Sequence, residues 1–160
     1  MKQILLATGL LALPCVVSST QGVSQAPENK QDDPRLERLR KFFAKYDSPL
    51  SKWAAEFITA ADENDLDWRL LPSISIIESG GGKLYINNNV FGWDSCRESF
   101  SSIQAGIHFV ASKLAKSKMY KGKNVDQKLS TYNPQPDYLP RVKAVMRALG
   151  SANQSNATMN

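Results

Sequence analysis

Residues 70–77 are apolar around almost the whole circumference of a helix, and they end at a carboxylate. The segment reads LLPSISII and is followed by Glu78, Ser79 and three glycines at 80–82. A helix that is apolar nearly all round belongs in the interior of a domain. We therefore expect a buried central helix from Trp68 to about Glu78. Asp67 is its expected N-cap, and Pro72 is expected to bend it slightly.

The rest of the chain also shows helical spacing, and it contains no strand with clean alternation and no internal repeat. Two helix starts are marked by an N-cap residue followed by proline, Asp33-Pro34 and Ser48-Pro49. The fold class is therefore mostly α. The apolar positions that define the further helices are Leu36, Leu39, Phe42 and Phe43; Trp53, Phe57, Ile58 and Ala61; Ile103, Ile107, Val110, Ala111 and Leu114; 125–129; and 137–149.

The two ends of the chain differ from its middle. Residues 1–26 have a basic start, an apolar stretch and small residues at two candidate cleavage sites, which is typical of a signal for export to a bacterial periplasm or envelope. A lipid anchor at Cys15 is an alternative, although Pro14 before it fits poorly. We expect a linker at 27–33, one domain at 34–149 and a disordered tail at 150–160. No run of about 18 apolar residues predicts a transmembrane span.

Composition excludes several kinds of chemistry. Once the signal is removed, Cys96 is the only cysteine, and it stands far from His108, the only histidine. This argues against a metal site and against Ser-His or Cys-His catalysis. We expect His108 to be a hydrogen-bonded, partly buried residue. The net charge of +5 is spread along the chain, which favours anionic envelope polymers over nucleic acid as partners.

Glu78 has the sequence context of a general acid. Apolar surroundings and the negative end of the helix dipole both raise the pKa of a carboxyl. A carboxyl that stays protonated near neutral pH can protonate the leaving oxygen of a glycosidic bond. The glycines at 80–82 would let the backbone turn sharply and leave room for a long ligand. The alternative is a solvated residue at a helix end with glycine as its stop signal.

The segment NNNVFGW at 87–93 offers groups that bind sugars. Asparagine amides can bind hydroxyl and N-acetyl groups, and the rings of Phe91 and Trp93 can stack on sugar faces, with Gly92 allowing close approach. The alternatives are that Phe91 belongs to the core and that the asparagines form only a turn.

Together, LLPSISIIESGGGK and NNNVFGW resemble segments of the lysozyme-like superfamily of bacterial cell-wall glycosidases. They are most similar to glucosaminidase-domain proteins and lytic transglycosylases. The similarity continues through SFSSIQAGIHFVASKL, Tyr120 and YNPQPDYLPRVKAVM. It covers about residues 50–148.

The resemblance implies a lysozyme-like helical domain with a catalytic Glu at the end of its buried central helix. Glu78 would be the acid and later the base, and Tyr132 would lie across the cleft and orient the acid or the substrate. The resemblance further implies a monomer without cofactor or metal that acts on peptidoglycan glycan strands. The remaining residues that it assigns to substrate binding or site support are Ser79, Asn88, Asn89, Phe91, Trp93, Asn133 and Tyr138.

One departure from the family bears on mechanism. Only DSCRES separates Trp93 from Phe100, which is too short for the β-hairpin lobe that brings a second carboxylate in glucosaminidases. Asp94 and Glu98 are expected at the surface. We therefore expect single-carboxylate cleavage of the β-1,4 bonds between N-acetylmuramic acid and N-acetylglucosamine. The product is either a reducing or a 1,6-anhydro end. The alternative is a non-catalytic peptidoglycan-binding or envelope-assembly module with the same fold.

Overall fold

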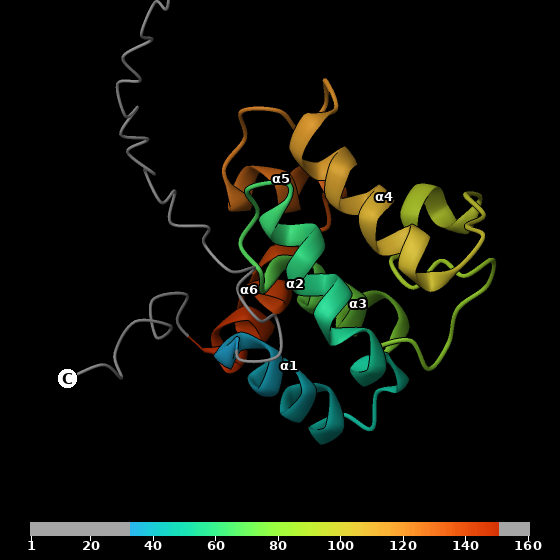
Figure 1. The fold of residues 1–160 in the computed structure, drawn as a ribbon. Coiled ribbons are helices and arrows are strands. Elements are labelled where there is room, and N and C mark those ends of the chain that lie inside the picture. Colours follow the sequence, from blue (N-terminus) through green and yellow to red (C-terminus); the bar gives the residue numbers. More distant parts are fainter. Residues whose placement is uncertain (1–32, 151–160) are drawn as a thin grey trace, which may run out of the picture.

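The computed structural model describes residues 33–150, which form a helical domain (Figure 1). Within this range the one β pairing is an isolated bridge between Ile86 and Asn89. The mostly α fold class is therefore confirmed. The expected signal, the Cys15 anchor, the linker up to residue 32 and the tail from 151 lie outside the described residues. The elements are α1 (Pro34–Lys45), η2 (Pro49–Trp53), α2 (Ala54–Asp62), α3 (Leu70–Ser79), η3 (Trp93–Cys96), α4 (Ile103–Lys116), α5 (Val125–Tyr132) and α6 (Tyr138–Leu149).

The expected buried central helix is α3. Its residues from Leu70 to Ser75 are all buried, and the helix packs against α2 and α6. In Figure 1, α1 and α4 lie on opposite sides of α2. Two serines inside this core, Ser73 and Ser75, break the apolar pattern, and the Ser75 hydroxyl donates to the Pro72 carbonyl at 2.8 Å. Burial of α3 thus fixes where its C-terminal carboxylate emerges.

The start of α3 differs from the sequence expectation. The helix begins at Leu70 rather than Trp68, and Arg69 occupies the N-cap position without a side-chain cap. Asp67 instead accepts the Arg69 backbone N–H and stabilises the preceding turn. Because Pro72 then falls in the first turn, where backbone N–H groups have no intrahelical partner, no hydrogen bond is lost to it and no bend is required.

The two proline start signals are borne out. Asp33 accepts the Arg35 backbone N–H at 2.8 Å, and Ser48 accepts that of Leu50 at 3.2 Å. The second signal opens the 3₁₀ turn η2, which continues directly into α2. Near the C-terminus, α5 extends three residues further than expected, to Tyr132.

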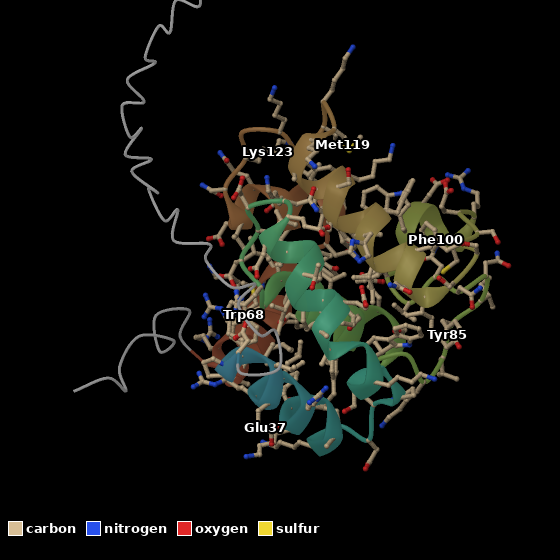
Figure 2. The ribbon with its side chains drawn as sticks, in the orientation of Figure 1. Glu37, Trp68, Tyr85, Phe100, Met119 and Lys123 are labelled. Carbon is tan, nitrogen blue, oxygen red and sulfur yellow. The ribbon has the colours of Figure 1, made fainter. Side chains whose placement is uncertain are left out.

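The core lies between α1, α2, α3, α4 and α6, with few large apolar side chains left outside it. Figure 2 shows Trp68, which is 5% exposed, among the helices, and Tyr85 and Met119 at the periphery. Leu84, Tyr85 and Ile86 form an exposed apolar stretch on the loop after α3. Among the described helices, none combines the length and apolarity needed to span a bilayer.

Candidate active site

The C-terminus of α3 places Glu78 at the edge of the core. Gly80 adopts a left-handed conformation at φ 61°, and the backbone N–H of Gly81 donates to Ser75 at 3.0 Å. This is a Schellman-type end, which needs a residue without a side chain at the left-handed position. The expectation that the glycines let the chain turn sharply is therefore confirmed.

The expectation that these glycines leave room for a ligand was wrong. Gly81 and Gly82 are buried against η2, where an added Cβ would lie 2.8 Å from the Ser48 hydroxyl or from Leu50. The glycine that leaves space beside the carboxyl is Gly92, because a Cβ there would lie 2.8 Å from Glu78 Oε2. Close packing against Ser48 and Leu50, rather than ligand access, explains Gly81 and Gly82, and the left-handed helix end explains Gly80.

Glu78 lines an open cleft with a volume of about 600 Å³. Four separate parts of the chain form its wall: the end of α3, the segment 92–95, Met119 with Tyr120, and the segment 131–134. Among the residues expected from sequence, Glu78, Trp93, Tyr132 and Asn133 meet here. The cleft therefore combines one half-buried carboxyl with an aromatic wall and an amide.

Burial raises the pKa of the Glu78 carboxyl above its ordinary value. The Tyr138 hydroxyl and the positive charge of Arg141 favour the ionised form and offset this effect only in part. The Tyr138 hydroxyl is buried near the carboxyl, without a hydrogen bond of regular geometry to any described group. Glu78 is thus held in surroundings that favour its protonated state more than water does.

Tyr132 lies close to Glu78, but its hydroxyl proton is already used in a hydrogen bond within the protein. Its hydroxyl donates to the Phe91 carbonyl at 2.5 Å, and burial followed by the Glu78 charge raises its pKa well above the ordinary value. Its ring stacks on Tyr138 with a centroid separation of 6.0 Å and an interplanar angle of 5°. Tyr132 is therefore suited to accepting a hydrogen bond and orienting a neighbour, and unsuited to being the acid.

Trp93 forms the aromatic wall of the cleft. Its half-buried ring contacts Tyr132, Tyr120 and Phe109 at centroid distances of 5.7, 6.0 and 6.2 Å. Three aromatic neighbours hold the indole in one orientation while one part of it stays accessible. A rigid, partly exposed aromatic ring of this kind suits stacking on a sugar face.

Two residues expected to contact a ligand have structural roles instead. Phe91 is fully buried and packs on Phe57 at a centroid distance of 6.1 Å, so its ring belongs to the core. Asn89 is 1% exposed. Its amide donates to the carbonyls of Trp93 and Glu98 and accepts the Trp93 backbone N–H. Both side chains are therefore fully used inside the protein, Phe91 by packing and Asn89 by hydrogen bonding.

Asn88 and Ser79 also act within the protein. The Asn88 amide donates to the Phe100 carbonyl at 2.8 Å, away from the cleft wall. The Ser79 hydroxyl donates to Ser75 and accepts the Gly82 backbone N–H, both at 2.9 Å. Ser79 therefore supports the turn after Glu78, which agrees with the supporting role that the resemblance implies.

Several cleft residues were not assigned by sequence reasoning. Tyr120 was noted only as part of the similarity, and Met119 and Thr131 carried no signal. Asp94 was expected at the surface; it is exposed, but it lines the cleft, and its carboxylate pairs with Arg97 at 2.6 Å. A single Thr or Met belongs to no sequence pattern that would predict a place in the wall of a cleft.

His108 lies outside the cleft, as expected. Its ring nitrogens contact Glu56 at 3.0 Å and Glu63 at 3.3 Å, and these contacts join α4 to the α2 region. The prediction of a hydrogen-bonded, partly buried histidine is confirmed. Within residues 33–150 no group of three or more His, Cys, Asp or Glu side chains could hold a metal ion.

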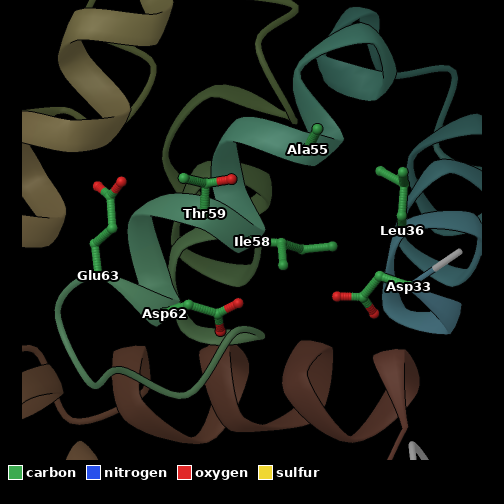
Figure 3. A pocket seen from close by; sticks show the side chains of 7 residues that line it. All are labelled: Asp33, Leu36, Ala55, Ile58, Thr59, Asp62 and Glu63. Carbon is green, nitrogen blue, oxygen red and sulfur yellow. The ribbon is translucent and has the colours of Figure 1, made fainter. Parts of the chain in front are cut away.

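A smaller pocket between α1 and α2, with a volume of about 160 Å³, offers a poorer site (Figure 3). Figure 3 shows the side chains of Asp33 and Asp62 pointing toward one another, and the Arg35 guanidinium pairs with them at 2.6 and 2.7 Å. Burial acts to raise the pKa of the Asp33 carboxyl, but its hydrogen bonds with Arg35 outweigh this and lower the pKa, which makes Asp33 a poor general acid. Its walls also lack an exposed aromatic ring.

The Glu78 cleft can therefore supply one general acid, one rigid aromatic face and polar groups at Tyr132 and Asn133. Such a set suits proton transfer to the oxygen of a bound polyhydroxylated ligand. No protein-family model, curated protein or solved structure matches the chain.

Proposed function

We propose that the chain cleaves the glycan strands of peptidoglycan at the β-1,4 bonds between N-acetylmuramic acid and N-acetylglucosamine. The observation that carries this proposal is the half-buried Glu78 carboxyl, with its raised pKa, in an open cleft that Trp93 and Tyr132 also line. The resemblance of its motifs to lysozyme-like cell-wall glycosidases supports the choice of substrate. Export to the periplasm or envelope, which the N-terminal segment predicts, is part of the same proposal.

In the proposed reaction a sugar stacks on Trp93 while Glu78 protonates the glycosidic oxygen that leaves. The N-acetyl group of the substrate stabilises the cationic sugar, since the other carboxylate in the cleft, Asp94, is paired with Arg97. Glu78, now ionised, accepts a proton from the attacking nucleophile. The Tyr132 hydroxyl continues to donate its hydrogen bond to the Phe91 carbonyl, and its oxygen positions the acid or a substrate hydroxyl.

The nucleophile determines the product. Attack by water leaves a reducing end, whereas attack by the 6-hydroxyl of the same sugar leaves a 1,6-anhydro end. The anhydro product is lighter by one water. Mass spectrometry of the released fragments therefore separates hydrolysis from the transglycosylase reaction.

The decisive test is Glu78→Gln, which keeps the shape of the side chain and removes its acid. Because positioned general acid catalysis contributes about 10²- to 10⁴-fold, we expect turnover of purified peptidoglycan to fall by that factor while the circular dichroism spectrum is retained. Asp94→Asn is the matched control in the same cleft, and we expect it to retain activity within a few-fold. Undiminished turnover by Glu78→Gln would refute the assignment.

The same assay tests the non-catalytic alternative. The pairing of Asp94 with Arg97 favours this alternative in one respect, because it leaves the cleft with one available acid. If the chain is only a binding module, the wild type will bind insoluble peptidoglycan and release no soluble fragments. Release of fragments by the wild type, lost in Glu78→Gln, excludes it.

A further inference from the structure

A second open pocket lies away from Glu78 and shares no wall residue with the first cleft. It has a volume of about 530 Å³ and lies between the connection from α2 to α3 and the segment that joins α4 to α5. Among its wall residues are Asn64 and Asp65 on one side and Lys116, Lys123 and Lys128 on the other. The proposed function does not use any of these side chains.

Lys128 is unusual because its side chain is buried. The residue is 8% exposed, and its ammonium group donates one hydrogen bond, to the Tyr120 carbonyl at 2.9 Å. An ammonium group has three protons to donate, and buried lysines are rare unless paired. Burial, followed by the nearby charge of Lys123, lowers the pKa of Lys128. The folded protein thus holds two like charges close together and leaves donors unused.

The pocket carries more positive than negative charge that is free to act on a ligand. The Lys123 ammonium donates to the neutral hydroxyl of Thr131 at 2.6 Å, and no described residue pairs with Lys116. Of the carboxylates in the wall, Asp67 is paired with Arg69 at 2.5 Å. Glu63 contacts the His108 ring, which carries a charge only when it is protonated, and Asp65 is exposed. The wall therefore has two carboxylates without a lysine or arginine partner against three lysines.

The wall also contains an unsatisfied acceptor. The Asn64 amide donates to the Ala60 carbonyl at 2.8 Å, but its oxygen is buried without a hydrogen-bond partner among the described residues. A buried polar atom without a partner costs free energy, because its hydrogen bond to water is lost and not replaced. The oxygen has almost no accessible surface, so a hydroxyl in the pocket satisfies it only when the Asn64 side chain turns toward the pocket. The wall therefore combines an excess of lysines with one hydrogen-bond acceptor that has no donor.

We propose that this pocket binds a small molecule that carries at least two oxyanion groups, carboxylate or phosphate, together with a hydroxyl. The ammonium groups of Lys128, Lys123 and Lys116 bind the oxyanions, and the hydroxyl lies on the Asn64 side. This site is independent of the glycosidase proposal and stands or falls separately from it.

The pocket is also linked to the first cleft. The carbonyl that accepts from Lys128 belongs to Tyr120, whose side chain lines the cleft and contacts Trp93. Thr131, the partner of Lys123, lines the cleft as well. An oxyanion that draws these two ammonium groups toward itself will therefore change the backbone environment of Tyr120.

The test is a titration of the folded full-length chain with citrate and, separately, with pyrophosphate, at an ionic strength held constant with sodium chloride. We expect saturable ¹⁵N–¹H shift changes at Asn64, Lys116 and 123–128, with a smaller change at Tyr120. Binding of citrate alone assigns a carboxylate ligand, and binding of pyrophosphate alone assigns a phosphate ligand. Shift changes that do not saturate, or that spread over all surface lysines, would overturn the proposal.

Charge-matched variants make the test specific. Lys123→Gln and Lys116→Gln each remove one charge from the wall, and we expect each to weaken binding about tenfold, which corresponds to about 1.4 kcal/mol. Lys118→Gln and Lys121→Gln remove the same charge from exposed positions outside the pocket and should change affinity less than twofold. Equal losses in both pairs would show only general electrostatic attraction and refute the site.

Lys128→Met extends the test to the buried position. Methionine keeps the apolar stem, so we expect the variant to fold and to lose saturable binding. If Lys128→Met fails to fold, the comparison of Lys123→Gln with Lys121→Gln still decides the proposal.

Discussion

At the scale of single residues, the candidate site depends on how one carboxyl is surrounded. Burial favours the protonated form of Glu78, and its two polar neighbours, Tyr138 and Arg141, favour the charged form less strongly. The result is an acid with a raised pKa that a ligand can still reach. Tyr132 differs, because its hydroxyl already donates to the Phe91 carbonyl and its ring is already stacked on Tyr138.

The raised pKa of Glu78 predicts a pH dependence of stability. The folded state binds this proton more tightly than the unfolded state, whose carboxyl has a pKa near the ordinary value of 4.5. The stabilisation is therefore fully present below that value and is lost as pH rises through the folded pKa. We expect the free energy of unfolding of the wild type to fall relative to Glu78→Gln over this interval. Urea unfolding of both proteins checks this, and parallel pH profiles would contradict it.

A second prediction at this scale concerns Gly92. An alanine Cβ at this position would lie 2.8 Å from Glu78 Oε2, and the backbone has φ 62°. Gly92→Ala should therefore displace the carboxyl and lower activity on peptidoglycan at least about tenfold, because a misplaced acid loses most of its effect. Gly122→Ala is the matched control: its φ is 78°, but an added Cβ meets nothing within 4 Å.

The two glycine variants share the backbone strain of a left-handed alanine, about 1–2 kcal/mol, and differ in the contact with Glu78. Thermal unfolding should therefore show similar losses of stability in both. If activity falls equally in the two variants, the effect is strain alone and Gly92 does not shape the site.

At the scale of elements, the loop from 86 to 98 and the end of α3 build the cleft together. The loop has almost no regular structure, and the Asn89 side chain holds it with three hydrogen bonds to the backbone of Trp93 and Glu98. Buried backbone groups need such partners when no helix or strand supplies them. The position of Trp93 in the cleft therefore follows from a buried amide four residues earlier.

Asn89→Ala should destabilise the domain and loosen this loop. Removing the amide leaves two carbonyls and one N–H without their partner, and we expect a loss of about 2–3 kcal/mol in urea unfolding. Asn133→Ala is the control: its amide makes one exposed bond, to the Gln135 N–H, and should cost less than about 1 kcal/mol. Equal losses would mean that Asn89 does not organise the loop.

At the scale of the whole molecule, the cleft exists only because distant segments converge. Glu78 and Asn133 are more than fifty residues apart in sequence, yet the packing of α3 against α6 and of α5 against α6 brings both to one wall. A ligand that spans these segments binds the folded chain and has no comparable site on the unfolded chain.

Binding of a glycan should therefore raise the thermal stability of the whole domain. Glu78→Gln prevents cleavage, so an oligomer of N-acetylglucosamine at about one hundred times its Kd should add about 2.7 kcal/mol. Trp93→Ala in the same background should abolish the shift. Trp53→Ala, which removes a half-buried indole outside the cleft, should retain it. A shift that survives loss of Trp93 would place the glycan elsewhere.

Local patterns were sufficient for the helices and for the location of the acid. Leu70, Leu71 and Ile74 have the spacing of a buried helix, and Asp33-Pro34 has the chemistry of a helix start, so the central helix and the first helix follow from neighbours in sequence. The position of Glu78 at the end of the buried helix follows from the same pattern.

What the sequence determined by itself is thus a mostly helical domain with one carboxyl at the end of its most apolar helix, because helical periodicity and capping depend on residues close in the chain. Only the tertiary structure decided that Trp93 faces the cleft while Phe91 enters the core, and that Gly92 rather than Gly81 gives the carboxyl its space. The loop that carries them has no period, and contacts with helices far away in sequence determine its conformation.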